Sequence, residues 1–162
     1  MKPIIVFGSI NIDLVTRVPQ LPVAGETLQG YEFFTAPGGK GANQAVAASQ
    51  LGIPTHLVGR LGNDEFGRQL LASLQGAGVH TDGILLDART TSGVAVISVD
   101  DAGENQIVIT PGANGRLNET DVGRLQPLLP GAVALLMQLE IPVSAVLSAA
   151  RTAHSVGVSN SN

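Results

Sequence analysis

The chain has 162 residues, of which 44% are hydrophobic and 14% charged, so it has the length and apolar content of one folded domain rather than of a disordered segment. Nine basic and thirteen acidic residues give a net charge of −4, and four Phe, one Tyr and no Trp leave few rings for stacking, so a nucleic-acid partner is not expected. The lack of cysteine excludes disulfides, thiolate metal sites and cysteine nucleophiles.

Neither a membrane span nor an export signal is apparent in the sequence. The longest mainly apolar segment covers residues 132–139, far fewer than the roughly 18 residues that a transmembrane helix needs. The apolar run at residues 4–7 is too short for the hydrophobic region of a signal peptide. We therefore expect a cytoplasmic protein with no membrane partner.

The first predicted element is an extended segment that carries two polar residues. Residues 4–7 are apolar, as in a buried strand, and residues 10–14 continue it with apolar and polar residues in alternation. The alternation places Asn11 and Asp13 on one face. Open α/β sheets hold ligands beyond their strand ends, and an amide and a carboxylate can bind sugar hydroxyls, so this pair is a candidate site. An Asx turn at the strand end explains the same residues equally well.

A glycine-rich loop precedes the first predicted helix. Residues 37–44 read Pro-Gly-Gly-Lys-Gly-Ala-Asn-Gln, and the Ala-rich segment 42–51 predicts the helix that follows. Backbone N–H groups at a helix start can approach a polar ligand closely where no Cβ intervenes. The spacing fits neither a Walker A loop nor a dinucleotide fingerprint. A structural turn would explain the glycines alone, whereas Lys40 and Asn43 in the same bend favour a binding site that includes Gly39.

The remaining elements alternate between strands and helices, apart from one hairpin. The expected strands lie at residues 56–58, at 132–139 and from 156–158 onward, and the expected helices follow Asn63 or Asp64 and cover 119–126 and 144–154. This order predicts a parallel sheet covered by helices. Residues 27–35 are a further candidate extended piece, and Asp82-Gly83 predicts a turn. Residues 94–99 and 107–110 flank a turn and predict a hairpin outside the main sheet.

Glu140 is the third candidate functional residue. It follows the predicted strand at 132–139, and a carboxylate at the end of a buried strand is unfavourable unless it is paired or binds a ligand. N-capping of the helix that follows is the alternative, and local sequence alone favours it. The three histidines are widely spaced, and no Gly-x-Ser-x-Gly motif is present, so we expect no metal ligands and no nucleophile triad.

Taken together, these motifs resemble the ribokinase branch of the PfkB carbohydrate kinases. The resemblance rests on Gly-Ser-Ile-Asn-Ile-Asp at residues 8–13, on the glycine loop and the small-residue spacing up to Gly62, and on Met-Gln-Leu-Glu at residues 137–140. It extends over the chain to about His154. The fold that it implies is α/β, a ribokinase-like parallel sheet flanked by helices with a small β lid.

The resemblance also implies a domain organisation and a partner. Residues 1–162 would form one truncated ribokinase-like domain, with lid segments at about residues 14–36 and 93–112. In ribokinases the lid also forms the dimer contact, so a homodimer through the β lid is implied here.

Carried over position by position, the resemblance implies a sugar site and an activity. The implied contacts to a ribose-like sugar are the hydroxyl-binding pair Asn11 and Asp13, the loop residues Gly39, Lys40 and Asn43, and Glu140. The implied reaction transfers phosphate from Mg-ATP to the 5-hydroxyl of D-ribose, with a monovalent cation as a second cofactor. The sugar itself stays open, because relatives that act on deoxyribose or nucleosides share the glycine loop.

This chain departs from the family in length, because family members are about twice as long. Their second half holds the ATP pocket, the cation site and a catalytic base in a Gly-Ala-Gly-Asp-like segment, and nothing after Glu140 resembles it. We therefore expect no catalytic residue here, poor binding of Mg-ATP and of the cation, and no kinase activity from this chain alone, because phosphoryl transfer needs charge neutralisation and a base.

Three alternatives remain open at this point. The chain could be a non-catalytic sugar-binding or lid-mediated dimerisation fragment, or a remnant that misfolds because one edge of its sheet is unpaired. A natural terminus with a frayed end would also explain the polar residues 159–162.

Overall fold

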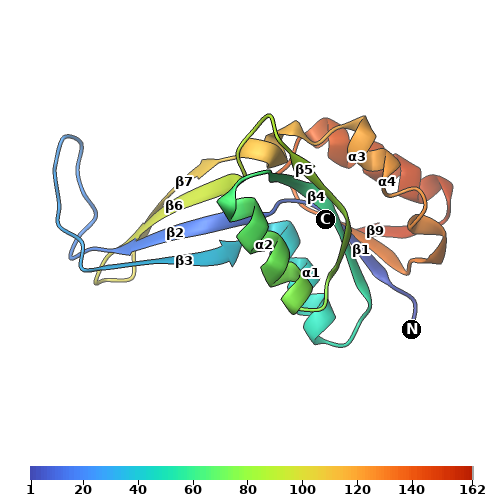
Figure 1. The fold of residues 1–162 in the computed structure, drawn as a ribbon, viewed down its shortest axis with the longest axis horizontal. Helices are drawn as coiled ribbons and strands as arrows, with labels where there is room; N and C mark the ends of the chain where they lie inside the picture. The colour runs from blue at the N-terminus through green and yellow to red at the C-terminus, as the bar shows by residue number, and fades with distance from the viewer. Residues whose placement is uncertain (162) are drawn as a thin grey trace.

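The computed structural model describes residues 1–161 and shows two β-sheets, the larger of which is covered by helices (Figure 1). The larger sheet has five strands in the order β5-β4-β1-β8-β9. Their bounds are His80–Asp87 (β5), Thr55–Gly62 (β4), Ile4–Phe7 (β1), Ala134–Met137 (β8) and Ser159–Ser161 (β9). Each pair of neighbours is parallel, which confirms the α/β class predicted from the alternation of elements.

The smaller sheet has four strands in the order β3-β2-β6-β7 and extends away from the larger sheet as an arm (Figure 1). Its strands are Glu32–Gly38 (β3), Asn11–Arg17 (β2), Gly93–Val99 (β6) and Asn105–Thr110 (β7). β6 and β7 form the predicted antiparallel hairpin, and in its turn the Asp100 carboxylate accepts hydrogen bonds from the N–H groups of Ala102 and Glu104. The hairpin lies outside the main sheet, as expected.

Two pairs of helices cover the two faces of the larger sheet. The helices are Lys40–Gln50 (α1), Glu65–Gly76 (α2), Glu119–Gly123 (α3) and Val143–Ser155 (α4), with short 3-10 helices at Gly112–Arg116 (η1) and Leu129–Gly131 (η2). Residues of α1 and α2 share one apolar cluster with Val6 of β1. Residues of α3 and α4 share the other with Ile5 and Phe7. Since strand side chains alternate between faces, β1 contributes to both cores.

The ends of the first two helices follow local chemistry. Asp64, one of the two predicted caps, accepts a hydrogen bond from the Gly67 N–H at 2.7 Å and begins α2. Gly52 and Gly78, just beyond α1 and α2, both have a φ of +79°, which L-residues with a side chain rarely adopt. These glycines therefore end the two helices.

The extended segment predicted from residue 4 to residue 14 is divided between the two sheets. β1 ends at Phe7, and β2 begins at Asn11 in the smaller sheet. Between them the N–H and the carbonyl of Ile10 bond to the side chain of Asn114 instead of to a neighbouring strand. The prediction of one continuous strand is therefore wrong, because a distant side chain satisfies the backbone at the bend.

Three other predictions were misplaced. Asp82 and Gly83 lie within β5, which the sequence analysis missed, and the pairing of β5 with β4 shifts register at this point. A Cβ on Gly83 would lie 2.7 Å from Cγ2 of Val58, so this glycine permits a close approach of strands and does not mark a turn. The strand expected from residue 156 starts at residue 159, after Gly157 with a φ of +75°. The extended segment expected at residues 27–35 is instead the strand β3, at Glu32–Gly38.

Among the helices of residues 1–161, none combines the length and the apolar character that crossing a membrane requires.

Candidate functional site

A hollow of about 170 Å³ lies where the smaller sheet meets the N-terminal end of α1. Its lining residues are Asn11, Asp13, Gly39, Lys40, Asn43, Ala95, Ile97, Ile107, Ile109 and Glu140. The list includes all six residues that the sequence analysis selected, so the fold brings them around one hollow. The other four are apolar residues of β6 and β7, and they were not predicted. Whether the six bind a ligand stays a prediction.

β2 contributes Asn11 and Asp13 from the same face of the strand. Both lie within β2, paired with β3 on one side and β6 on the other, so the Asx-turn interpretation is wrong. A Cβ on Gly38 would collide with the Asp13 carboxylate. The absence of a side chain at Gly38 therefore makes the space that Asp13 occupies.

The turn from β3 into α1 depends on Gly39. This residue has a φ of +92°, and a Cβ on it would lie 2.8 Å from the backbone nitrogen of Asn11. Two residues further on, a Cβ on Gly41 would lie 2.7 Å from the carbonyl carbon of Gly8. The glycines therefore let the start of α1 pack directly on the backbone between β1 and β2, which brings Lys40 and Asn43 to the hollow.

Glu140 bonds to the start of α1 at the same hollow. Its Oε2 accepts hydrogen bonds from the Ser9 hydroxyl at 2.8 Å and from the Lys40 backbone N–H at 3.2 Å. Its Oε1 lies 3.5 Å from Lys40 Nζ. The expectation that Glu140 caps the following helix is wrong, because α4 begins at Val143 with Pro142 at its cap. The carboxylate instead lies at the N-terminus of α1, where the helix dipole favours a negative charge.

Two carboxylates therefore share this hollow. Burial raises the pKa of the Asp13 carboxyl, and the negative charge of Glu140 raises it further. A carboxylate with a raised pKa is a stronger hydrogen-bond acceptor than an ordinary aspartate. The arrangement suits a neutral ligand with several hydroxyl groups better than an anion.

Two residues that hold the site together, Ser9 and Asn114, were not predicted from the sequence. Ser9 bridges Glu140 and α1, since its hydroxyl also accepts from the Gly41 N–H at 3.4 Å. Asn114 of η1 is 1% exposed and bonds to Ile10 and Asn11. The partners of Asn114 lie more than 100 positions away in the chain, so no local pattern identifies it.

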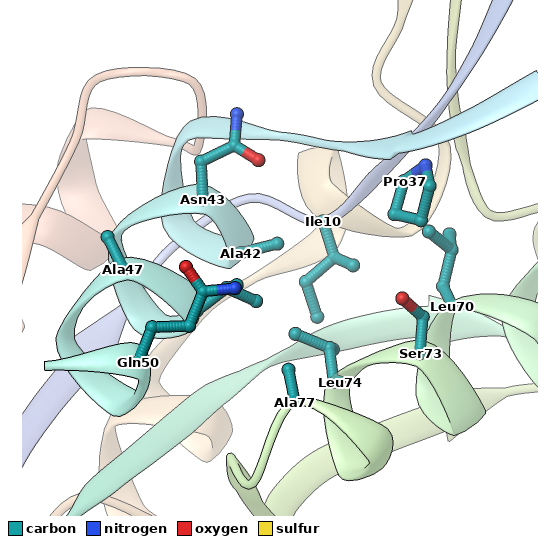
Figure 2. A pocket seen from close by; sticks show the side chains of 11 residues that line it. Ile10, Pro37, Ala42, Asn43, Ala47, Gln50, Leu70, Ser73, Leu74 and Ala77 are labelled. Carbon is teal, nitrogen blue, oxygen red and sulfur yellow. The ribbon is translucent and has the colours of Figure 1, made fainter. Parts of the chain in front are cut away.

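A second and larger cleft, of about 390 Å³, separates α1 from α2 (Figure 2). Figure 2 shows Ala42, Asn43, Ala47 and Gln50 on the α1 side and Leu70, Ser73, Leu74 and Ala77 on the α2 side, with Ile10 between them. Apolar side chains dominate, and the charged residues of the first hollow do not reach it. The smaller hollow therefore offers the better chemistry for a polar ligand, although Asn43 lines both.

In residues 1–161, no three His, Asp or Glu side chains are grouped so that they could hold a metal ion.

The family model for pfkB family carbohydrate kinases matches residues 1–161, and the chain belongs to this family. It is 41% identical over 164 residues to a ribokinase of Schizosaccharomyces pombe, covering 98% of this chain and 52% of that protein. It is 40% identical over 157 residues to a ribokinase of Haemophilus influenzae, covering 97% of this chain and 51% of that protein.

A solved structure shows the same similarity in three dimensions. Ribokinase of Arabidopsis thaliana, complexed with ribose and ATP, superposes with a TM-score of 0.86 at 34% identity, over 98% of this chain and 52% of that one. The chain thus spans about half the length of the relatives that it matches.

Proposed function

We propose that this chain is the sugar-binding half of a ribokinase-type carbohydrate kinase, whose complete form transfers phosphate from ATP to the 5-hydroxyl of D-ribose. The convergence of the six selected residues around one hollow carries the proposal. The similarity to ribokinases of two organisms supports the substrate, as does the Arabidopsis ribokinase structure that contains ribose.

The proposed binding mode uses hydrogen-bond acceptors and donors that line the same hollow. Asp13 and Glu140 would accept hydrogen bonds from sugar hydroxyls, and the Lys40 ammonium and the amide of Asn43 would donate to sugar oxygens. The apolar side chains of Ala95, Ile97, Ile107 and Ile109 would cover the carbon skeleton and reduce contact with water. Glu140 is already bonded by Ser9 and Lys40, so the acceptor is oriented before the sugar arrives.

We propose that the phosphate donor and its ions bind the complete protein. Solved ribokinases contain ATP in one case and ADP in another, which supports Mg-ATP as the donor. Mg²⁺ would neutralise phosphate charge, and a monovalent cation is the second ion that the family resemblance implies. The residues of this chain that we assign all act on the acceptor sugar, so no catalytic base is proposed among them.

A non-catalytic sugar-binding or dimerisation fragment is the second candidate. The smaller sheet, which we propose acts as a lid formed by about residues 14–36 and 93–112 of a single 1–162 domain, exposes large apolar side chains. They include Phe33 at 66% and Val108 at 62% exposure. Such a surface favours a second copy of the chain as the partner. Sedimentation that yields a dimer for the wild type and a monomer for Val108→Asp would support this candidate.

We also propose that the protein is cytoplasmic, because the ribokinase-type assignment favours that location.

The proposed sugar site can be tested by nuclear magnetic resonance. Titration of the ¹⁵N-labelled chain with D-ribose should shift the backbone signals of Gly39 and Lys40, at the hollow, and leave those of Gln50 and Ser73, in the second cleft, in place. Shifts confined to the second cleft would contradict the assignment. ADP release that depends on ribose and ATP would show that the chain is an active kinase and not half of one.

A further inference from the structure

Asn114 makes three hydrogen bonds at the bend between the two sheets. Its Oδ1 accepts from the Ile10 N–H at 2.9 Å. Its Nδ2 donates to the Ile10 carbonyl at 3.0 Å and to Oδ1 of Asn11 at 2.7 Å. The side chain is 1% exposed, so water does not compete for these bonds. Both donors of the amide and one acceptor are therefore used.

The two bonds to Ile10 determine which end of the Asn114 amide is the oxygen. A backbone N–H can only donate and a backbone carbonyl can only accept, so Oδ1 must face the first and Nδ2 the second. The remaining hydrogen of Nδ2 then requires an acceptor from Asn11, which turns Oδ1 of Asn11 toward Asn114. The backbone of Ile10 thus sets the orientation of two successive side-chain amides.

Gly93 provides an independent sign that this amide contact is built into the fold. A Cβ on Gly93 would collide with both Oδ1 of Asn11 and Nδ2 of Asn114. Gly93 has no positive φ, so its backbone conformation does not demand glycine. The amides of Asn11 and Asn114 occupy the space that a side chain at Gly93 would fill. The segment that carries Asn114 is held as well, since the Ala113 N–H donates to the Thr91 carbonyl at 2.8 Å.

We infer that Asn114 is a positioning residue, which holds Asn11 so that the carboxamide nitrogen of Asn11 donates into the hollow. Asn11 lines this hollow, and its oxygen is already bonded to Asn114. β2 then presents a donor at Asn11 and an acceptor at Asp13, two residues apart on one face. Two adjacent hydroxyls of a polyol match this pair, one accepting and the other donating. The ligand part of this inference rests on the proposed function, whereas the orientation of the amides does not.

The orientation can be measured in the free protein. In the uniformly ¹³C,¹⁵N-labelled chain, a scalar coupling across the hydrogen bond should connect Nδ2 of Asn114 to Cγ of Asn11. A folded sample in which this coupling is absent, or in which it runs from Nδ2 of Asn11 to Cγ of Asn114, would overturn the inference. The measurement needs neither a ligand nor a variant, so it decides the orientation even if ribose does not bind.

The consequence for binding is tested with two matched substitutions. Asn11→Asp keeps an oxygen toward Asn114 but replaces the donor in the hollow by an acceptor, and it should weaken ribose binding roughly 10-fold. Asn114→Asp removes the donor that orients Asn11 and should weaken binding by a similar factor. Both substitutions act on the same donor, because the first removes Nδ2 of Asn11 and the second leaves the Asn11 amide without the bond that orients it.

Asn118→Asp is the control, since this residue is the N-cap of α3, where aspartate serves as well as asparagine. Ribose binding by Asn11→Asp at the wild-type affinity would refute the inference while leaving the sugar site in place. A wild type that binds no ribose would instead count against the proposed function.

Discussion

Glu140 and Lys40 lie 100 positions apart in the chain, yet the carboxylate of Glu140 accepts a hydrogen bond from the backbone N–H of Lys40 at 3.2 Å. Lys40 is the first residue of α1. The contact therefore joins the end of β8 to the helix that follows the glycine loop. It places both charges at the same hollow.

Replacing Lys40 by Ala should weaken sugar binding without destabilising the fold. The side chain is 68% exposed and its ion pair with Glu140 is at the surface, so we expect a loss of less than about 1 kcal/mol in the free energy of unfolding. Ribose affinity should fall roughly 10-fold or more, because a charged donor is lost. Calorimetry and urea unfolding measure the two effects separately. Lys2→Ala, at an exposed position far from the hollow in sequence, is the control, and equal affinities for the two variants would remove Lys40 from the site.

Gly38→Ala should damage the site through Asp13. The added methyl would collide with the Asp13 carboxylate, and we expect overpacking to lower the free energy of unfolding by roughly 1–3 kcal/mol and to weaken ribose binding. Gly76→Ala is the matched control, because a Cβ there meets nothing within 4 Å and the residue lies in α2. If both substitutions have the same effect on urea unfolding, Gly38 is not required for space.

The buried guanidinium of Arg60 should be essential for stability. It bonds to both carboxylate oxygens of Asp121 at 2.8 and 3.0 Å and to Asp87 at 3.1 Å, and Arg60 itself is 3% exposed. Arg60→Met would leave the Asp121 carboxylate without its main partner, and such losses amount to roughly 3–5 kcal/mol. Urea unfolding provides the measurement.

Arg68→Met serves as the comparison for Arg60. Arg68 pairs with Glu65 on an exposed face of α2, where an ion pair contributes less than about 1 kcal/mol. If the two substitutions lower the free energy of unfolding by similar amounts, burial does not make the Arg60 ion pairs more stabilising than an exposed pair.

The alternation of elements was predictable because it depends on local chemistry. α1 was recognised from its small, Ala-rich sequence, α2 from its N-cap, and the β6–β7 hairpin from its turn. The bend at Ile10 and the role of Glu140 were not, because each depends on a partner about 100 positions away. β5 was missed because Asp82 and Gly83 are typical turn residues, whereas here glycine serves strand contact. The six site residues were selected from spacing and family resemblance together.

Acid should destabilise the protein through His56. Its imidazole is partly buried and stacks on His80 with ring centroids 4.6 Å apart. Burial lowers the pKa of His56, and the neighbouring His80 lowers it further. The folded state then binds fewer protons than the unfolded state. The contribution of His56 to the free energy of unfolding is therefore fully present above its unfolded pKa of about 6.5. It is lost as the pH falls from that value through the lower pKa of the folded state.

His56→Phe keeps an aromatic ring on His80 but cannot be protonated. Its urea midpoint should change less than that of the wild type between pH 7.5 and pH 5. An identical decrease in both proteins would assign the acid sensitivity to other groups.

The most direct test of the sugar site is calorimetric titration of the folded 162-residue chain with D-ribose, alongside Asp13→Asn. The substitution preserves shape and removes a charged acceptor that lines the hollow. We predict saturable binding at one site per chain and an affinity at least roughly 10-fold lower for Asp13→Asn. Asp82→Asn, at an exposed position in β5, should bind ribose as the wild type does. A folded chain that releases no heat with ribose, or an Asp13→Asn variant that binds it with undiminished affinity, would contradict the account.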